Sequence, residues 1–325
     1  MRHRTLLSTF VLGALAAACS SGGDSTGTTT TTTQSTTTSG GGGGAGGAGG
    51  HQGGSGPSCD SLGEGGASCS LSSYPPGTEE TAVDIVTADI MDLDGQPAAG
   101  IPAEVCGYNM CYTGVANASG HMSVNAAGSS LTVALMLYGD GIDWVRLFAP
   151  LPNPGDTAFG TITAARLPTE AQGAPLVLGQ DAVSGDVTLH LDAAAFVEFD
   201  ILTYGCEVAL PTFRTVTIPV DGSATLPAVT PALSLGMLFG MAPINTLICP
   251  AAKMTVPNLP GWAANAEVEF LLEGTSIFQE WAMLRDWTKV SDGAVSADGT
   301  TVSTADGQGI PMIGTIGVRL KAPGG

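Results

Sequence analysis

The sequence predicts an all-β protein made of antiparallel β-sandwich domains that follow a disordered linker. Three observations predict this class. Residues 59–325 alternate apolar and polar side chains over short runs, which is the pattern of half-buried strands. Gly, Pro and Asp-Gly pairs separate those runs, and they favour tight turns. Few windows show helical spacing.

Composition limits the size and the partners of the protein. With 325 residues, 43% of them hydrophobic, the chain is long enough for one large domain or two ordinary ones. It carries 10 Lys plus Arg against 29 Asp plus Glu, a net charge of -19. Such an acidic chain repels phosphate backbones. Nucleic acid is therefore excluded as a partner.

The N-terminus has the layout of a secretory signal peptide. Arg2, His3 and Arg4 precede an apolar run over residues 6–18, and that run is too short to span a bilayer. Residues 15–19 read Leu-Ala-Ala-Ala-Cys, which resembles the lipobox of bacterial lipoproteins.

The lipoprotein resemblance implies that residues 1–18 are removed and that Cys19 becomes an acylated first residue, carrying palmitate-type chains. One position departs from the family, because Ala16 stands where Leu is usual. Ser20 follows the cysteine, where lipoproteins retained in the inner membrane carry Asp. The resemblance thus implies the outer membrane of a Gram-negative cell. Ordinary cleavage beside Ala16 and Ala18 is the alternative.

Residues 20–58 consist almost wholly of Gly, Ser and Thr. Such a composition cannot bury a core. With the acylated cysteine, residues 19–58 form a disordered tether, and as a flexible coil it spans roughly 30 to 37 Å. Residues 59–80 are a cysteine-containing lead-in to the first domain.

Within the body, four segments alternate clearly: residues 186–192, 197–201, 216–220 and 267–272. Each predicts a strand with one buried face. The apolar segment 233–241 is flanked by prolines, and it is expected to be a buried strand or a short helix.

The region 81–168 suggests a family for the first domain. Val83-Asp84-Ile85-Val86 leads into residues 92–101, Asp-Leu-Asp-Gly-Gln-Pro-Ala-Ala-Gly-Ile, and later into a Ser-Gly turn at 118–121. This order resembles carboxypeptidase-regulatory-like domains, which are transthyretin-like sandwiches. The resemblance covers under a third of the chain and implies a structural or adhesive role without catalytic residues.

Residues 175–325 are expected to form a second β-rich domain. Its end, with Val256-Pro257-Asn258 before residues 290–300, resembles the tail of uncharacterised exported proteins. Asp-Gly pairs at 292–293, 298–299 and 306–307 predict the turns of a small β-meander.

Cysteine parity predicts disulfides. Of the 7 cysteines, six remain after Cys19: Cys59, Cys69, Cys106, Cys111, Cys206 and Cys249. An even set in an exported protein indicates a disulfide framework, which allows about fifteen connectivities. Proximity in sequence favours the pairs Cys59–Cys69, Cys106–Cys111 and Cys206–Cys249.

Two metal hypotheses compete with simpler interpretations. Cys106 and Cys111 with His121 and His190 offer ligands that zinc prefers, but export favours a disulfide. The acidic turn with Asp89, Asp92 and Asp94 is a weak calcium candidate. It is not an EF-hand, because Pro97 and Ala103 stand where that loop needs Gly and Glu. A plain hairpin turn is favoured.

Three aromatic residues near the C-terminus, Trp262, Trp281 and Trp287, are candidates for stacking on sugar rings. Core packing is the alternative, since Trp is highly buried on average.

No catalytic constellation emerges from the remaining residues. His190 lies on the polar face of a strand and His121 follows a glycine turn, so both are expected to be solvated. No cofactor and no catalytic residue is expected. The sequence predicts a noncatalytic, surface-anchored lipoprotein with a structural, display or adhesion role. Its expected partners are the membrane, through the lipid, and envelope polysaccharide or other surface proteins. The alternative is a carbohydrate-binding accessory lipoprotein.

Overall fold

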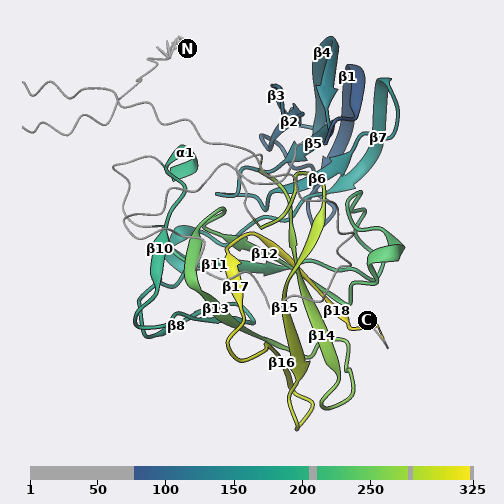
Figure 1. Ribbon diagram of the computed structural model, residues 1–325. Helices are drawn as coiled ribbons and strands as arrows, with labels where there is room; N and C mark the ends of the chain where they lie inside the picture. Colours follow the sequence, from purple (N-terminus) through teal and green to yellow (C-terminus); the bar gives the residue numbers. More distant parts are fainter. Residues whose placement is uncertain (1–76, 205–210, 277–280, 323–325) are drawn as a thin grey trace, which may run out of the picture. The chain divides into compact units, whose positions relative to one another are not determined.

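The computed structural model describes residues 77–204, 211–276 and 281–322 (Figure 1). Strands dominate these residues, which confirms the all-β prediction. The helical elements there are a four-residue turn, α1 (Ile201–Tyr204), and the 3-10 turns Glu170–Gln172 and Pro231–Leu233. The predicted signal peptide, the predicted tether and most of the predicted lead-in lie outside the described residues. No helix among the described residues is long and apolar enough to cross a bilayer.

The first strands form two sheets. A three-stranded sheet has the order β4-β1-β7, and a four-stranded sheet has the order β3-β2-β5-β6. The strands are β1 (Glu80–Met91), β2 (Pro102–Cys106), β3 (Cys111–Val115), β4 (His121–Thr132), β5 (Leu135–Tyr138), β6 (Leu147–Pro150) and β7 (Gly155–Thr163). All pairings are antiparallel except that β1 and β7 run parallel.

The later strands form one large sheet of the order β11-β12-β18-β14-β15-β16-β13-β9-β8, with β10 and β17 also paired to β13. They are β8 (Asp181–Ser184), β9 (Val187–His190), β10 (Phe196–Glu198), β11 (Arg214–Thr217), β12 (Met237–Ala242), β13 (Leu247–Pro257), β14 (Glu267–Glu273), β15 (Trp287–Val295), β16 (Thr301–Thr304), β17 (Ile310–Met312) and β18 (Thr315–Leu320).

Side-chain hydrogen bonds connect the two end strands of this large sheet. The Thr215 amide donates to Ser184 Oγ at 2.9 Å, and the Thr215 hydroxyl donates to the Ser184 carbonyl. Because β8 and β11 meet here, the large sheet, hereafter the closed sheet, curls around its own apolar cluster, which includes Leu189, Phe239 and Phe270. Both end strands thereby gain partners, which limits edge-to-edge association.

The four-stranded sheet is buried on both faces. Alternate residues such as Val105, Met136 and Leu147 belong to the core shared with the three-stranded sheet, so these two sheets form a sandwich. Cys106, Leu135, Leu137 and Phe148 point to the other face, where Ala228 and Leu284 cover them. This double burial explains why β5, Leu-Met-Leu-Tyr, is apolar at every position.

The sandwich core also contains Ile218, Leu238 and Ala242 from the later part of the chain. The described residues all fall in one compact unit, 52–325. The division into domains at 81–168 and 175–325 stays a prediction.

Local predictions were mostly confirmed. Val187 and Leu189 are buried in β9, and Val268, Phe270 and Leu272 are buried in β14. In the segment 233–241 the alternative of a buried strand is confirmed, since β12 starts at Met237 and is buried throughout, and the 3-10 turn ends at Leu233.

Three local predictions were wrong. The strand expected over 216–220 is β11, which ends at Thr217. The strand expected over 197–201 ends at Glu198, and α1 begins at Ile201. The turn expected at Asp292-Gly293 is instead the interior of β15. A Cβ on Gly293 would lie 2.4 Å from the Ser303 carbonyl oxygen and 2.6 Å from the Phe270 ring, so glycine is needed there for close packing. The pairs ending in Gly299 and Gly307 do turn with positive φ, 75° and 73°.

Candidate functional site

The hairpin of β2 and β3 is closed by a disulfide. Cys106 and Cys111 are directly opposed in the strand register, their Cα atoms are 4.1 Å apart and their sulfurs are bonded. The predicted pair Cys106–Cys111 is confirmed, and these cysteines are therefore not zinc ligands in this structure.

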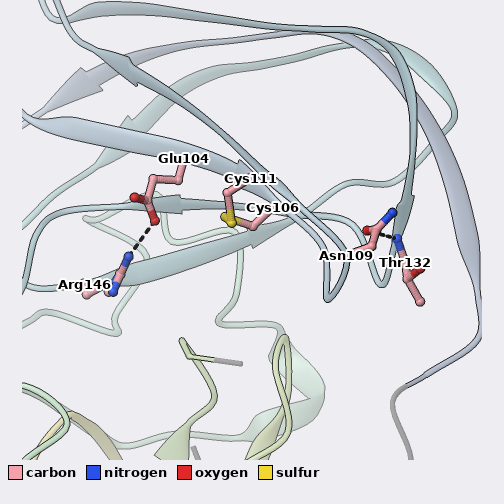
Figure 2. The surroundings of a disulfide bond; sticks show 6 residues. All are labelled: Glu104, Cys106, Asn109, Cys111, Thr132 and Arg146. Carbon is pink, nitrogen blue, oxygen red and sulfur yellow. Dashed lines mark hydrogen bonds and ion pairs between the residues drawn. A yellow bond between two sulfur atoms is a disulfide. The ribbon is translucent and has the colours of Figure 1, made fainter. Parts of the chain in front are cut away.

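The tip of this hairpin is bound to β4 through Asn109 (Figure 2). The Asn109 amide group donates to the Ser130 carbonyl at 2.8 Å, and its oxygen accepts the Thr132 amide at 3.0 Å. The Tyr108 amide adds a bond to the Thr132 carbonyl. One side chain thus substitutes for a strand pairing and holds the hairpin tip in place.

A cavity of about 430 Å³ lies beside the disulfide. On the hairpin side it is lined by the ion pair between Glu104 and Arg146, whose Oε2 and Nη2 are 2.6 Å apart (Figure 2). Residues from the later chain complete it. The lining residues are Pro102, Glu104, Cys106, Cys111, Leu137, Gly139, Asp140, Ile142, Arg146, Asp200, Thr203, Asn245, Thr275, Ser276 and Leu284.

The ionisable groups of this cavity already have partners. Asp140 Oδ1 accepts the backbone amides of Ile142, Asp143 and Trp144 at 2.9 to 3.0 Å, and Asp200 Oδ2 accepts the Thr203 hydroxyl at 2.7 Å. Carboxylates committed in this way stabilise the walls.

Both histidines of the described residues sit in cross-strand pairs with aspartate. His121 Nδ1 lies 2.7 Å from Asp89 Oδ1, and His190 Nδ1 lies 2.6 Å from Asp181 Oδ1. All four side chains are about half exposed, so the expected solvation agrees with the structure. Sequence reasoning missed the partners, because they follow from the registers of β1 with β4 and of β8 with β9.

The weak calcium candidates do not gather around a common point. Asp92 Oδ1 accepts the amides of Asp94 and Gln96 at 3.0 and 2.8 Å, which is turn chemistry, and Asp89 pairs with His121. Among the described residues, no three His, Cys, Asp or Glu side chains form a group that could hold a metal ion.

The three tryptophans are each partly buried. Trp262 and Trp281 pack against the core of the closed sheet, whereas Trp287 packs against the two other clusters. The Trp287 indole N–H donates to the Ala228 carbonyl at 3.1 Å. All three therefore pack partly against apolar clusters, and sugar stacking by these residues stays a prediction.

The remaining sequence candidates fall outside the described residues or in turns. Cys19, Cys59, Cys69 and Cys206 lie outside them, and Cys249 is disulfide-bonded. Asp298 closes the turn between β15 and β16. Hydrogen bonds from the Ser296 hydroxyl and from Thr300 lower the pKa of Asp298 to about 2.

Sequence reasoning missed two buried charged residues, Arg214 and Glu273, each 1% exposed. The Arg214 guanidinium donates to the carbonyls of Ile142 and Pro168 at 2.7 and 3.0 Å and lies 2.6 Å from a Glu170 oxygen. Burial raises the pKa of Glu273 to about 8. Neither residue has a local signal, because long-range packing alone buries it.

No family model and no curated protein matches this chain. Among solved structures, the full-length major pilin SpaD from Corynebacterium diphtheriae aligns with 74% of this chain at 12% identity and a TM-score of 0.19. The chain spans 57% of that pilin's length. A similarity with so low a TM-score assigns neither a fold nor a function to the chain.

Proposed function

We propose that this protein is a noncatalytic structural or adhesive component of the bacterial cell envelope, anchored by lipid at Cys19 and displayed on the tether of residues 19–58. The observation that carries the proposal is the disulfide between Cys106 and Cys111. Disulfides persist in oxidising compartments outside the cytoplasm, which agrees with the signal-peptide pattern.

The architecture supports a structural role. The described strands bury three apolar clusters, and the cavity beside the disulfide has its carboxylates engaged by amides, hydroxyls and Arg146. A transthyretin-like identity for the first sandwich belongs to this proposal, and it rests on the resemblance of residues 81–168.

Anchoring is tested by metabolic labelling with palmitate and by detergent phase partition of the whole protein. We expect the mature protein to incorporate label and to enter the detergent phase, because two or more acyl chains give stable anchorage. Cys19→Ala should abolish both while the body stays folded. A mature N-terminus that begins with unmodified Cys19 would overturn lipid anchoring and leave ordinary secretory cleavage.

The role is tested separately on the secreted body without its tether. Glycan arrays and binding to envelope fractions should detect association of the body with other proteins or with surfaces. Assays with ester, peptide and glycan substrates should detect no hydrolysis. Specific binding to one glycan class would replace the structural role with the carbohydrate-binding alternative.

A further inference from the structure

A buried carboxyl group connects the closed sheet to the sandwich. Glu273 is the last residue of β14 and is 1% exposed. Its Oε1 accepts a hydrogen bond of 3.1 Å from the backbone amide of Phe148. Phe148 belongs to β6, an end strand of the four-stranded sheet. The contact therefore joins an end-strand amide in one sheet to a side chain of another.

Thr315, in β18, strengthens the same junction. Its hydroxyl donates to the Arg146 carbonyl at 3.0 Å, just before β6 begins. Phe148 also packs in the apolar cluster with Leu284. We call this junction of β6 with β14 and β18 the seam.

Among the described residues, the groups placed near Glu273 by strand register or by electrostatic interaction are neutral or engaged elsewhere. Tyr138 in β5 is buried, and burial together with the charge of Glu273 raises its pKa. The Arg146 side chain is directed to Glu104 at 2.6 Å. Trp287, the register partner of Glu273 in β15, is uncharged. The Phe148 amide favours ionised Glu273, but its effect on the pKa is weaker than that of burial.

A carboxyl group in such surroundings strongly favours its neutral form, because an ionised carboxylate loses its hydration on burial. A neutral acid still offers its carbonyl oxygen to the Phe148 amide. The seam is thus well matched to protonated Glu273 and poorly matched to its anion.

We propose that Glu273 is a pH-dependent latch: as a neutral acid it holds β6 of the sandwich against β14 of the closed sheet, and release of its proton to solvent loosens this seam reversibly. The proposal does not depend on lipid anchoring or on the proposed role.

The direction follows from proton linkage. The folded pKa of Glu273, about 8, lies above its ordinary value of 4.5. The folded state therefore holds a proton that the opened state releases, and closure is favoured below pH 4.5 and weakens as the pH rises towards 8. In this interval each pH unit shifts the opening equilibrium by up to about tenfold. Above about pH 8 the opening equilibrium no longer changes with the protonation of Glu273.

The test is amide hydrogen exchange of the whole mature protein between pH 5 and 9, corrected for the intrinsic rates. We expect protection of Phe148 and its neighbours in β6 to fall by at least about tenfold across the interval. In Glu273→Gln the side-chain amide oxygen can still accept the Phe148 hydrogen bond, but the side chain cannot ionise. The fall in β6 protection with pH should therefore disappear. The matched control is Glu267→Gln on the same strand, where the side chain is largely exposed and paired with Lys321. Glu267→Gln should keep the wild-type dependence of β6 protection on pH.

An equal pH dependence in wild type and Glu273→Gln would overturn the latch, as would protection of β6 that does not change with pH in the wild type. Should Glu273→Gln fail to fold, infrared difference spectroscopy of the wild type decides. A buried protonated carboxyl band at pH 7 that disappears on alkalinisation, with a matching loss of β6 protection, supports the proposal. Absence of that band at pH 7 overturns it.

Discussion

At the residue scale, the least predictable features are the charged side chains in the interior. Arg214 follows Thr212 and Phe213 in a run that gives no local sign of a buried charge, yet its guanidinium is buried and donates to two carbonyls from distant segments. A pattern of hydrophobicity places a charge on the surface by default. Only the tertiary contacts show that Arg214 joins β11 to the segment between the two predicted domains.

Replacing Arg214 by Met should destabilise the protein by about 3 kcal/mol, because the Ile142 and Pro168 carbonyls would lose their donor. The free energy of unfolding from urea titration measures this. Lys253→Met is the control, since Lys253 is about half exposed and pairs with the almost fully exposed Asp306 at the surface. Its loss should stay below about 1 kcal/mol. Equal losses in the two variants would contradict the role assigned to Arg214.

Asp298 illustrates a turn residue whose chemistry the sequence did predict. The Ser296 hydroxyl bonds its carboxylate at 2.6 Å, and this contact is the largest cause of its low pKa. Ser296→Ala should therefore raise the pKa of Asp298 from about 2 towards 3.8. Carboxyl-carbon NMR titration measures the shift, and Ser303→Ala serves as control because Ser303 bonds Thr255 instead. An unchanged pKa in Ser296→Ala would assign the effect to Thr300 alone.

At the element scale, prediction succeeded where one strand face is buried and the other solvated. The alternation in β9 and β14 shows that pattern directly. It failed at Ile201 and at Gly293, because α1 and the interior of β15 depend on contacts with other strands. The pairing of the disulfide hairpin was predictable, since cysteines that flank a four-residue turn fall opposite each other.

Removing the hairpin disulfide by Cys106→Ser with Cys111→Ser should lower the free energy of unfolding by about 2 kcal/mol, because the loop that it closes is short. Asn109 still holds the tip to β4, so the β-sheet circular dichroism should persist. Urea titration in oxidising buffer measures the loss. The wild type in reducing buffer provides the comparison. If its free energy of unfolding equals that of the oxidised wild type, the crosslink contributes no stability.

At the scale of the whole molecule, the sequence indicated two β-rich regions but not how they share a core. Leu238 belongs to β12 of the closed sheet, yet it packs in the cluster of the sandwich together with Ile218. Local alternation reveals that a face is buried but not which sheet covers it. The shared core therefore favours cooperative unfolding across the predicted boundary near residues 168–175.

We expect one cooperative unfolding transition for the described body. Leu238→Ala should destabilise it by about 2 to 5 kcal/mol, with hydrogen-exchange protection falling equally in β1 and in β14. A fragment of residues 77–168 should lack native protection, since Ile218, Leu238 and Ala242 would be missing from its core. Separate transitions for the two regions, or a folded fragment, would establish two autonomous domains.

The charge distribution affects how the protein associates with other copies and with charged surfaces. In the described ranges every basic side chain is engaged: Arg166 lies 4.3 Å from the centre of the Trp144 ring, and the others form ion pairs with carboxylates, namely Arg146, Arg214, Lys253, Arg285, Lys289, Arg319 and Lys321. The surplus carboxylates of a chain with net charge -19 thus set the field around it. Copies of the protein, and anionic surfaces, should repel it at low salt.

Millimolar Ca²⁺ should therefore increase self-association or binding to anionic envelope surfaces, because a divalent cation screens and bridges carboxylates more strongly than Na⁺ at equal ionic strength. Sedimentation velocity with and without Ca²⁺, against an ionic-strength-matched NaCl control, measures the effect. His121→Ala and His190→Ala should leave it unchanged, since both side chains are half exposed and each contacts a single Asp. If either variant abolished a measured activity, that histidine would belong to a functional site, and the structural role proposed for the protein would be wrong.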